Sequence, residues 1–108
     1  MEPRKRQIEN YLSADGHDPF HEWLCRIRDS KVKQAVRLRL NRVMEGNFGD
    51  CKPVGEGVHE LRFDLGPGYR VYFGEDADRV ILLAAGSKGS TQDKDIRIAK
   101  ERWRDYNA

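Results

Sequence analysis

Two neighbouring stretches hold the side chains best suited to phosphate chemistry. In residues 58–65, apolar side chains alternate with the charged ones, Glu60, Arg62 and Asp64. In residues 69–74 the same alternation separates Arg70 and Tyr72 from apolar neighbours. Successive side chains of a strand point to opposite faces, so the charged residues of each stretch share one face. Two arginines on one face suit a phosphodiester, because each guanidinium binds two oxygens at once.

The turn Gly66-Pro67-Gly68 joins these stretches into a predicted hairpin. Pairing Leu65 with Tyr69 keeps both apolar faces on one core, and it sets Asp64 opposite Arg70 and Arg62 opposite Tyr72. Such pairs are also ordinary sheet contacts, an ion pair and a cation–π contact. Pattern alone therefore leaves a structural and a functional interpretation of this face open.

The elements that would position this hairpin follow from periodicity. A strand is expected over residues 4–12, and further strands over 58–65, 69–74 and 80–85, the last an apolar run buried on both faces. Residues 47–57, rich in glycine, are expected to form a long loop. With three helices, the order is β-α-α-β-β-β-α. We expect a single α+β domain over residues 1–108, with one mostly antiparallel four-stranded sheet and helices on its apolar face.

The helices are indicated by their caps and stripes. Asp18 before Pro19 begins the first helix, Asp29-Ser30 begins the second, and Ser90 is expected to cap the last. The short connection between the first two predicts an antiparallel helical hairpin. Arg39 falls inside the apolar stripe of the second helix, so its long side chain must reach the surface or meet an anion.

Charge is unevenly distributed along the 108 residues. The whole chain has 20 Lys+Arg and 18 Asp+Glu, a formal net charge of +2. Residues 26–42 contain seven cations and one anion, a net charge of +6, and this segment includes Lys33 and Arg37. It indicates a polyanionic partner or a solvated helix face.

Other classes of function find little support. Cys25 and Cys51 match no zinc or redox spacing, and His17 and His21 lack an evident third metal ligand. No apolar run is long enough to span a membrane, and the amino-terminal residues lack the apolar region of a secretory signal. We expect a cytoplasmic protein with reduced thiols.

Two segments carry a family resemblance. Residues 46–73, GNFGDCKPVGEGVHELRFDLGPGYRVYF, and residues 87–96, SKGSTQDKDI, resemble the RelE/HigB-type toxins of bacterial type II toxin–antitoxin modules. The likeness is greatest to the phage-related addiction module killer proteins, and it extends over nearly the whole chain. It implies a RelE-like fold with the element order given above.

The resemblance also implies an activity, the cleavage of mRNA on the ribosome without a metal or other cofactor. A ribose 2′-hydroxyl attacks the adjacent phosphate, which needs a proton acceptor, a proton donor and cations around the developing charge. Carried over to this sequence, the catalytic candidates are Arg70, Arg62 and Lys88. Tyr72 and Asp93 are candidates for proton transfer, which the resemblance leaves open. The candidates for RNA binding are Lys52, Lys94, Lys33 and Arg37.

The expected partners are mRNA, ribosomal RNA and a small helix-turn-helix antitoxin, with DNA bound only through the antitoxin and no membrane association. Two alternatives remain open at this point. One is a ParE-like toxin that binds DNA gyrase without cutting RNA, and the other is an inactive phage-borne binding module.

Overall fold

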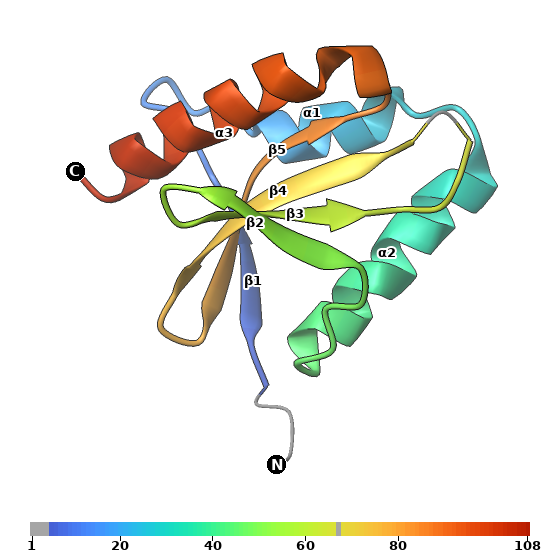
Figure 1. Cartoon of the computed structure of the whole chain (residues 1–108), viewed down its shortest axis with the longest axis horizontal. Coiled ribbons are helices and arrows are strands. Elements are labelled where there is room, and N and C mark those ends of the chain that lie inside the picture. Colours follow the sequence, from blue (N-terminus) through green and yellow to red (C-terminus); the bar gives the residue numbers. More distant parts are fainter. Residues whose placement is uncertain (1–4, 67) are drawn as a thin grey trace.

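The computed structural model describes residues 5–66 and 68–108, which form one five-stranded sheet with helices on both faces (Figure 1). Arg4, at the start of the first predicted strand, and Pro67, in the predicted turn, lie outside the described residues. In chain order the elements are β1 (Gln7–Asn10), α1 (Pro19–Arg26), α2 (Ser30–Met44), β2 (Cys51–Gly55), β3 (Val58–Arg62), β4 (Arg70–Asp76), β5 (Arg79–Gly86), the short 3-10 helix η1 (Gly89–Thr91) and α3 (Gln92–Tyr106).

The expectation of a four-stranded sheet is wrong by one strand. The strand order is β1-β5-β4-β3-β2, and β2 lies within the segment predicted to be a loop. This strand contains Pro53 and ends at Gly55, so its residues carry a weak strand signal. It forms because it pairs with β3 at the edge of the sheet, where a proline is tolerated.

The sheet is mixed, since β1 runs parallel to β5 while the other pairs are antiparallel. The residues between β1 and β2, which include α1 and α2, separate β1 from the antiparallel strands in sequence. Strand β5 lies between β1 and β4, and Val80 to Ala84 are all buried. The prediction that this apolar run is buried on both faces is confirmed.

Helices cover both faces, and the expectation that all of them pack on one face is wrong (Figure 1). Helices α1 and α2 bury Trp23, Val36 and neighbours against Leu61, Val71 and Phe73. Helix α3 packs Ala99 and Trp103 against the opposite face, next to Tyr72. The face that carries the charged residues of β3 and β4 is therefore partly covered.

The predicted helix starts are confirmed for α1 and α2. The Asp18 carboxylate accepts a hydrogen bond from the His21 amide, and that of Asp29 accepts one from Lys31. Helix α3 instead follows η1 and has Thr91 as its N-cap residue, so Ser90 does not cap it. Helices α1 and α2 diverge from their connection and do not lie side by side as a hairpin (Figure 1).

The register of the central hairpin differs from the prediction by two residues. Arg62 lies directly opposite Arg70, and Glu60 opposite Tyr72. A shift of two preserves which face each side chain occupies, so Arg62 and Arg70 share a face as predicted. The shift removes the expected Asp64–Arg70 and Arg62–Tyr72 pairs and brings the two arginines closer together.

No helix within residues 5–66 and 68–108 combines the length and apolar character needed to cross a bilayer.

Candidate functional site: a buried carboxylate among cations

Glu60 lies at the centre of the charged face and is completely buried. Its Oε1 atom lies 4.0 Å from the Lys52 ammonium and 3.9 Å from Arg62 Nε, and its Oε2 atom lies 3.7 Å from Arg70 Nε. Lys52 lies on β2 directly opposite Glu60, and Arg62 follows Glu60 by two positions in β3. Three cations surround one carboxylate, so the cluster keeps an excess of two positive charges.

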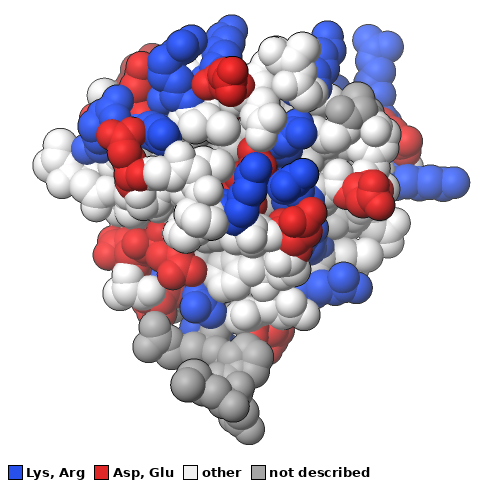
Figure 2. Space-filling view, viewed as in Figure 1, with Lys and Arg blue, Asp and Glu red and all other residues white. Residues whose placement is uncertain are grey.

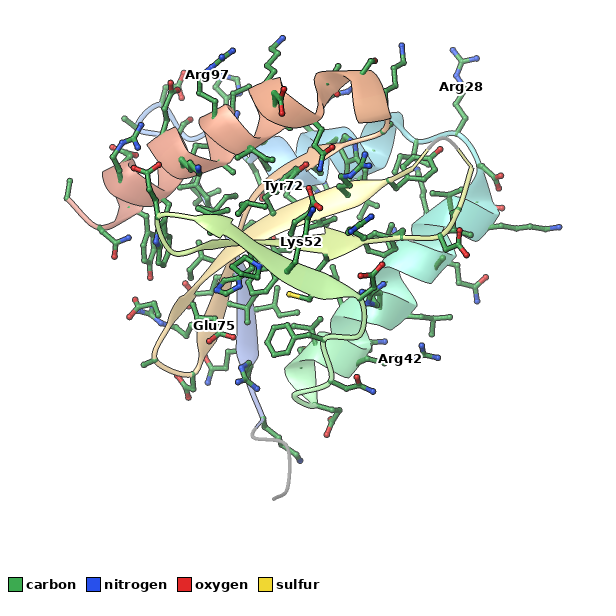
Figure 3. All side chains as sticks on the ribbon, viewed as in Figure 1. Arg28, Arg42, Lys52, Tyr72, Glu75 and Arg97 are labelled. Carbon is green, nitrogen blue, oxygen red and sulfur yellow. The ribbon has the colours of Figure 1, made fainter. Side chains whose placement is uncertain are left out.

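Figure 2 shows Lys and Arg side chains gathered around acidic side chains over the middle of this face. In Figure 3, Lys52 projects in front of the strands, whereas Tyr72 lies between the sheet and α3. The cations differ in access to solvent: the side chains of Lys52 and Arg62 are 48% and 45% exposed, and that of Arg70 is 18% exposed. The carboxylate forms the floor of the cluster and the cations form its outer layer.

Helix α3 supplies a further contact to Glu60. Gln92, the first residue of α3, donates a hydrogen bond of 2.9 Å from Nε2 to Glu60 Oε2. Three buried polar atoms nearby, Glu60 Oε1, Arg70 Nε and the Tyr72 hydroxyl, have no hydrogen-bond partner among the described residues. Buried polar atoms usually have partners, so these three groups interact mainly through the opposite charges of Glu60 and Arg70.

The Tyr72 hydroxyl stays protonated at neutral pH. Its pKa is raised chiefly by burial, and the negative charge of Glu60 raises it further. Tyr72 has no exposed surface, so it contacts Glu60 and α3 rather than solvent. It is therefore placed to orient the carboxylate.

Arg70 lies between two loops. Its Nη1 atom donates a hydrogen bond of 3.0 Å to the carbonyl oxygen of Gly68. A Cβ atom added at Gly89 would lie 3.8 Å from Arg70 Nη1, so the loop after β5 lies against the guanidinium. Lys88 precedes Gly89 and is exposed on that loop. Arg70 is thus held in position before any ligand arrives.

A groove of about 300 Å³ opens beside the cluster. It is lined by Asp50, Arg62, Phe63, Asp64, Gly68, Tyr69 and Arg70. Its volume is at the lower end of the range of small-ligand sites. Both arginines reach this groove, so a bound anion can contact them without entering the core.

Arg39 fixes the strand ends that frame this groove. Its guanidinium donates hydrogen bonds to the carbonyl oxygens of Phe48, Arg62 and Asp50, at 3.0, 2.8 and 2.9 Å. It also lies 5.0 Å from the centre of the Phe63 ring. Burial lowers the pKa of Arg39, although its guanidinium stays charged. The expectation is that Arg39 reaches the surface or meets an anion. It binds three carbonyl oxygens, and the negative charge of Asp50 opposes the lowering of its pKa.

The structure brings four of the predicted site residues together, namely Arg62, Arg70, Lys52 and Tyr72, with Lys88 on the adjoining loop. Asp93 lies elsewhere, in a second groove lined also by Glu56, Ile96, Arg97, Lys100 and Arg104. Lys94 is exposed on the first turn of α3. Lys33 and Arg37 belong to α2, on the opposite side of the sheet from the cluster.

Sequence reasoning missed Glu60 and Gln92 as site residues. An acidic residue that alternates with arginine on a strand was the available signal for Glu60. Nothing in the sequence marked Gln92, because its contact with Glu60 depends on where α3 crosses the sheet. Within residues 5–66 and 68–108, no group of three or more His, Cys, Asp or Glu side chains could hold a metal ion.

The geometry can perform two tasks. The excess positive charge of the Glu60 cluster attracts an anion, and the paired guanidinium groups can hold the oxygens of a phosphate. The carboxylate beneath them is completely buried, and it can accept a proton from a group that the cations hold only after it has been uncovered. Fold and site together define a small α+β protein with a cluster of cations around a buried carboxylate on one face of a mixed sheet.

Comparison with known proteins finds a similar protein. No family model matches the chain. An uncharacterized protein of Haemophilus influenzae (strain ATCC 51907 / DSM 11121 / KW20 / Rd) is 43% identical over 81 residues, which cover 75% of this chain and 82% of the relative. The chain belongs to the same family as this H. influenzae protein.

Proposed function

We propose that this protein is the toxin of a type II toxin–antitoxin module, an endoribonuclease that cuts mRNA on the ribosome. One observation carries the proposal: Arg62 and Arg70 face each other across β3 and β4, and both lie within 4.0 Å of the Glu60 carboxylate and line one open groove. The resemblance of residues 46–73 and 87–96 to RelE/HigB-type toxins supports the same function.

The reaction needs only the residues of this face. Glu60 accepts the proton of a ribose 2′-hydroxyl, whose oxygen attacks the neighbouring phosphorus. Arg62 and Arg70 bind the phosphate oxygens and stabilise the charge that develops on them. The bond from phosphorus to the 5′-oxygen breaks, and the Lys88 ammonium gives that oxygen a proton. The products are a 2′,3′-cyclic phosphate and a 5′-hydroxyl.

Glu60 is covered in the resting protein, so substrate binding must uncover it. Lys52 and Arg62 are the more exposed members of the cluster, and their long side chains can turn toward an incoming phosphate. Arg70 is held by Gly68 and stays in place. In this proposal Gln92 and Tyr72 orient the carboxylate, and Asp93 takes no part in the chemistry.

The proposed RNA partners follow from charge, and the proposed antitoxin follows from the resemblance to RelE/HigB-type toxins. Lys33 and Arg37 on α2, with Lys94 on α3, contact ribosomal RNA, while Lys52 contacts mRNA phosphate. A helix-turn-helix antitoxin covers the cluster, and DNA is bound only through the antitoxin. In this proposal the protein acts in the cytoplasm.

The test uses purified protein, a labelled RNA and 70S ribosomes carrying an mRNA. We expect cleavage of the ribosome-bound mRNA, with products that end in a cyclic phosphate and a 5′-hydroxyl. A single 2′-deoxy nucleotide at the mapped position abolishes that cut, because it lacks the attacking oxygen. Persistent cleavage at a 2′-deoxy position would contradict the mechanism.

Matched variants separate the chemistry from folding. We expect Arg70→Ala to lower the cleavage rate about 10²–10³-fold, and Glu60→Gln to lower it about 10²–10⁴-fold. Arg97→Ala is the control, because Arg97 is an exposed cation on the outer side of α3 (Figure 3). An Arg70→Ala variant that is folded by circular dichroism and as active as the parent would refute the assignment. Growth arrest with intact RNA and gyrase-linked DNA breaks would refute the function itself.

A further inference from the structure

We propose that the groove beside Arg62 and Arg70 is a subsite for one nucleobase, and that its carboxylates select guanine. This inference rests on the proposed function and names the substrate feature that the site recognises. It starts from an anomaly: two aspartates, Asp50 and Asp64, line a groove that is proposed to bind a polyanion.

The aspartates cancel the charge of the two arginines in the groove lining. Carboxylates repel RNA phosphates, so they lower affinity unless they bind something other than phosphate. In nucleic-acid recognition a carboxylate accepts hydrogen bonds from the N–H groups of base edges. The groove therefore combines cations that hold a phosphate with acceptors that can contact the neighbouring base.

Among the described residues both aspartates lack a direct side-chain partner, although the negative charge of Asp50 opposes the lowering of the Arg39 pKa. Within residues 5–66 and 68–108, no ion pair or hydrogen bond involves the carboxylate of Asp50 or Asp64. The register explains why Asp64 does not pair with Arg70. Arg70 lies opposite Arg62, and the Nε atom of Arg70 faces Glu60. Both carboxylates are exposed and keep their acceptor atoms available.

The backbone that carries the Asp50 side chain is nevertheless anchored. The carbonyl oxygen of Asp50 accepts hydrogen bonds of 2.9 Å from the Arg62 amide and 2.9 Å from Arg39 Nη2. Asp64 follows Arg62 by two positions. A backbone anchored in this way holds its side chain close to a bound base at little entropic cost.

The lining also offers an aromatic ring. Tyr69 is half-buried and packs edge-on against Trp23, with ring centres 6.3 Å apart. Trp23 is itself fixed by a hydrogen bond of 3.0 Å from Nε1 to the Ser87 hydroxyl. Proteins that bind single-stranded RNA commonly stack an unpaired base on such a ring and contact its Watson–Crick edge.

Guanine is the base that this arrangement fits. Its Watson–Crick edge presents two adjacent donors, N1–H and the N2 amino group, which match the two oxygens of one carboxylate. Adenine and cytosine present one amino donor beside an acceptor, and a carboxylate repels that acceptor. Uracil has a single N–H between two carbonyl oxygens. The pair of aspartates thus favours guanine over the other three.

The test measures binding rather than cleavage. Five 2′-O-methyl pentanucleotides, which cannot be cut by 2′-hydroxyl attack, carry guanine, inosine, adenine, cytosine or uracil at the central position. Fluorescence anisotropy then gives a dissociation constant for each with the parent protein. We expect guanine to bind about tenfold or more tightly than inosine, which lacks the N2 amino group, and than the other bases.

Variants assign the preference to residues. At least one of the variants Asp50→Asn and Asp64→Asn should bring the ratio of guanine to inosine affinity close to one. The ratio is the readout because removal of a negative charge strengthens binding to every RNA. Asp78→Asn, an exposed aspartate of the turn before β5, is the control and should keep the parent ratio.

The outcomes distinguish this inference from the proposed function. Equal affinity for all five oligonucleotides, a preference for another base, or a guanine preference that survives both aspartate variants would overturn the subsite. Cleavage of RNA without base preference would leave the endoribonuclease standing and refute the subsite alone. Guanine preference lost in the aspartate variants, with no cleavage of unmodified RNA, would support the subsite and refute the nuclease.

Discussion

Arg39 offers a direct test of how the fold holds the site. Its guanidinium links α2 to the loop before β2 and to the end of β3 through hydrogen bonds to the carbonyl oxygens of Phe48, Asp50 and Arg62. Arg39→Met removes the charge and all donors but keeps an apolar stem of similar length. Arg39→Lys keeps the charge but cannot donate to three separate carbonyls in a fixed geometry.

The expected loss follows from these contacts. A hydrogen bond from a charged donor contributes about 1.5–3 kcal/mol net. The sum of three bonds overstates the effect, because carbonyl oxygens near the surface regain water when the donor is removed. We expect Arg39→Met to lower the free energy of unfolding by about 2–4 kcal/mol, and Arg39→Lys by about half as much.

Urea unfolding followed by circular dichroism measures this free energy. The matched control is Arg37→Met, an exposed cation of the same helix, which should stay within about 0.5 kcal/mol of the parent. An Arg39→Met variant as stable as that control would show that the three contacts do not hold the strand ends. Because the carbonyl of Asp50 is one of the acceptors, Arg39→Lys should also weaken the guanine preference of the groove.

Two further predictions concern stability. A Cβ atom at Gly74 would lie 2.6 Å from the Trp103 ring, so Gly74→Ala should destabilise the protein by about 1–3 kcal/mol in thermal or urea unfolding. Gly89→Ala, whose Cβ meets only an ordinary contact at 3.8 Å, should be tolerated; equal stability of the two variants would contradict the packing argument. The hydroxyl of Tyr106 donates to Asp76 and, with the Arg79 charge, lowers the pKa of that carboxyl. The depressed pKa adds stability above the unfolded value of about 3.9, and this is lost as pH falls through the folded value. Asp76→Asn should therefore flatten the acid limb of a stability–pH curve, and an unchanged limb would refute the coupling.

Much of the local structure was predictable because it depends on neighbours in sequence. The carboxylates of Asp18 and Asp29 accept hydrogen bonds from free amide N–H groups at the starts of their own helices, and these N–H groups need an acceptor in any fold. The apolar run of β5 has no polar position to turn toward water, so it had to be central. The alternation in β3 and β4 likewise set Arg62 and Arg70 on one face.

Features that depend on distant residues were not predictable. Strand β2 has only a weak strand signal and forms through its pairing with β3. The register of β3 and β4 moved by two residues, a change that the alternation of faces permits. Whether β3 and β4 expose or cover their charged face was decided by α3, which packs against Tyr72 and sends Gln92 to Glu60.

The sequence alone determined the order of most elements, the positions of the first two helix starts, and the side of the sheet on which the two arginines lie. These follow from spacings of two and of three to four residues, which the backbone converts directly into faces. Only the tertiary structure turned Glu60 into a buried carboxylate, made Arg39 an anchor for backbone carbonyls and left Asp50 and Asp64 unpaired beside Arg62. The burial and charge environment of a side chain is set by the segments that pack over it, and these segments come from far along the chain.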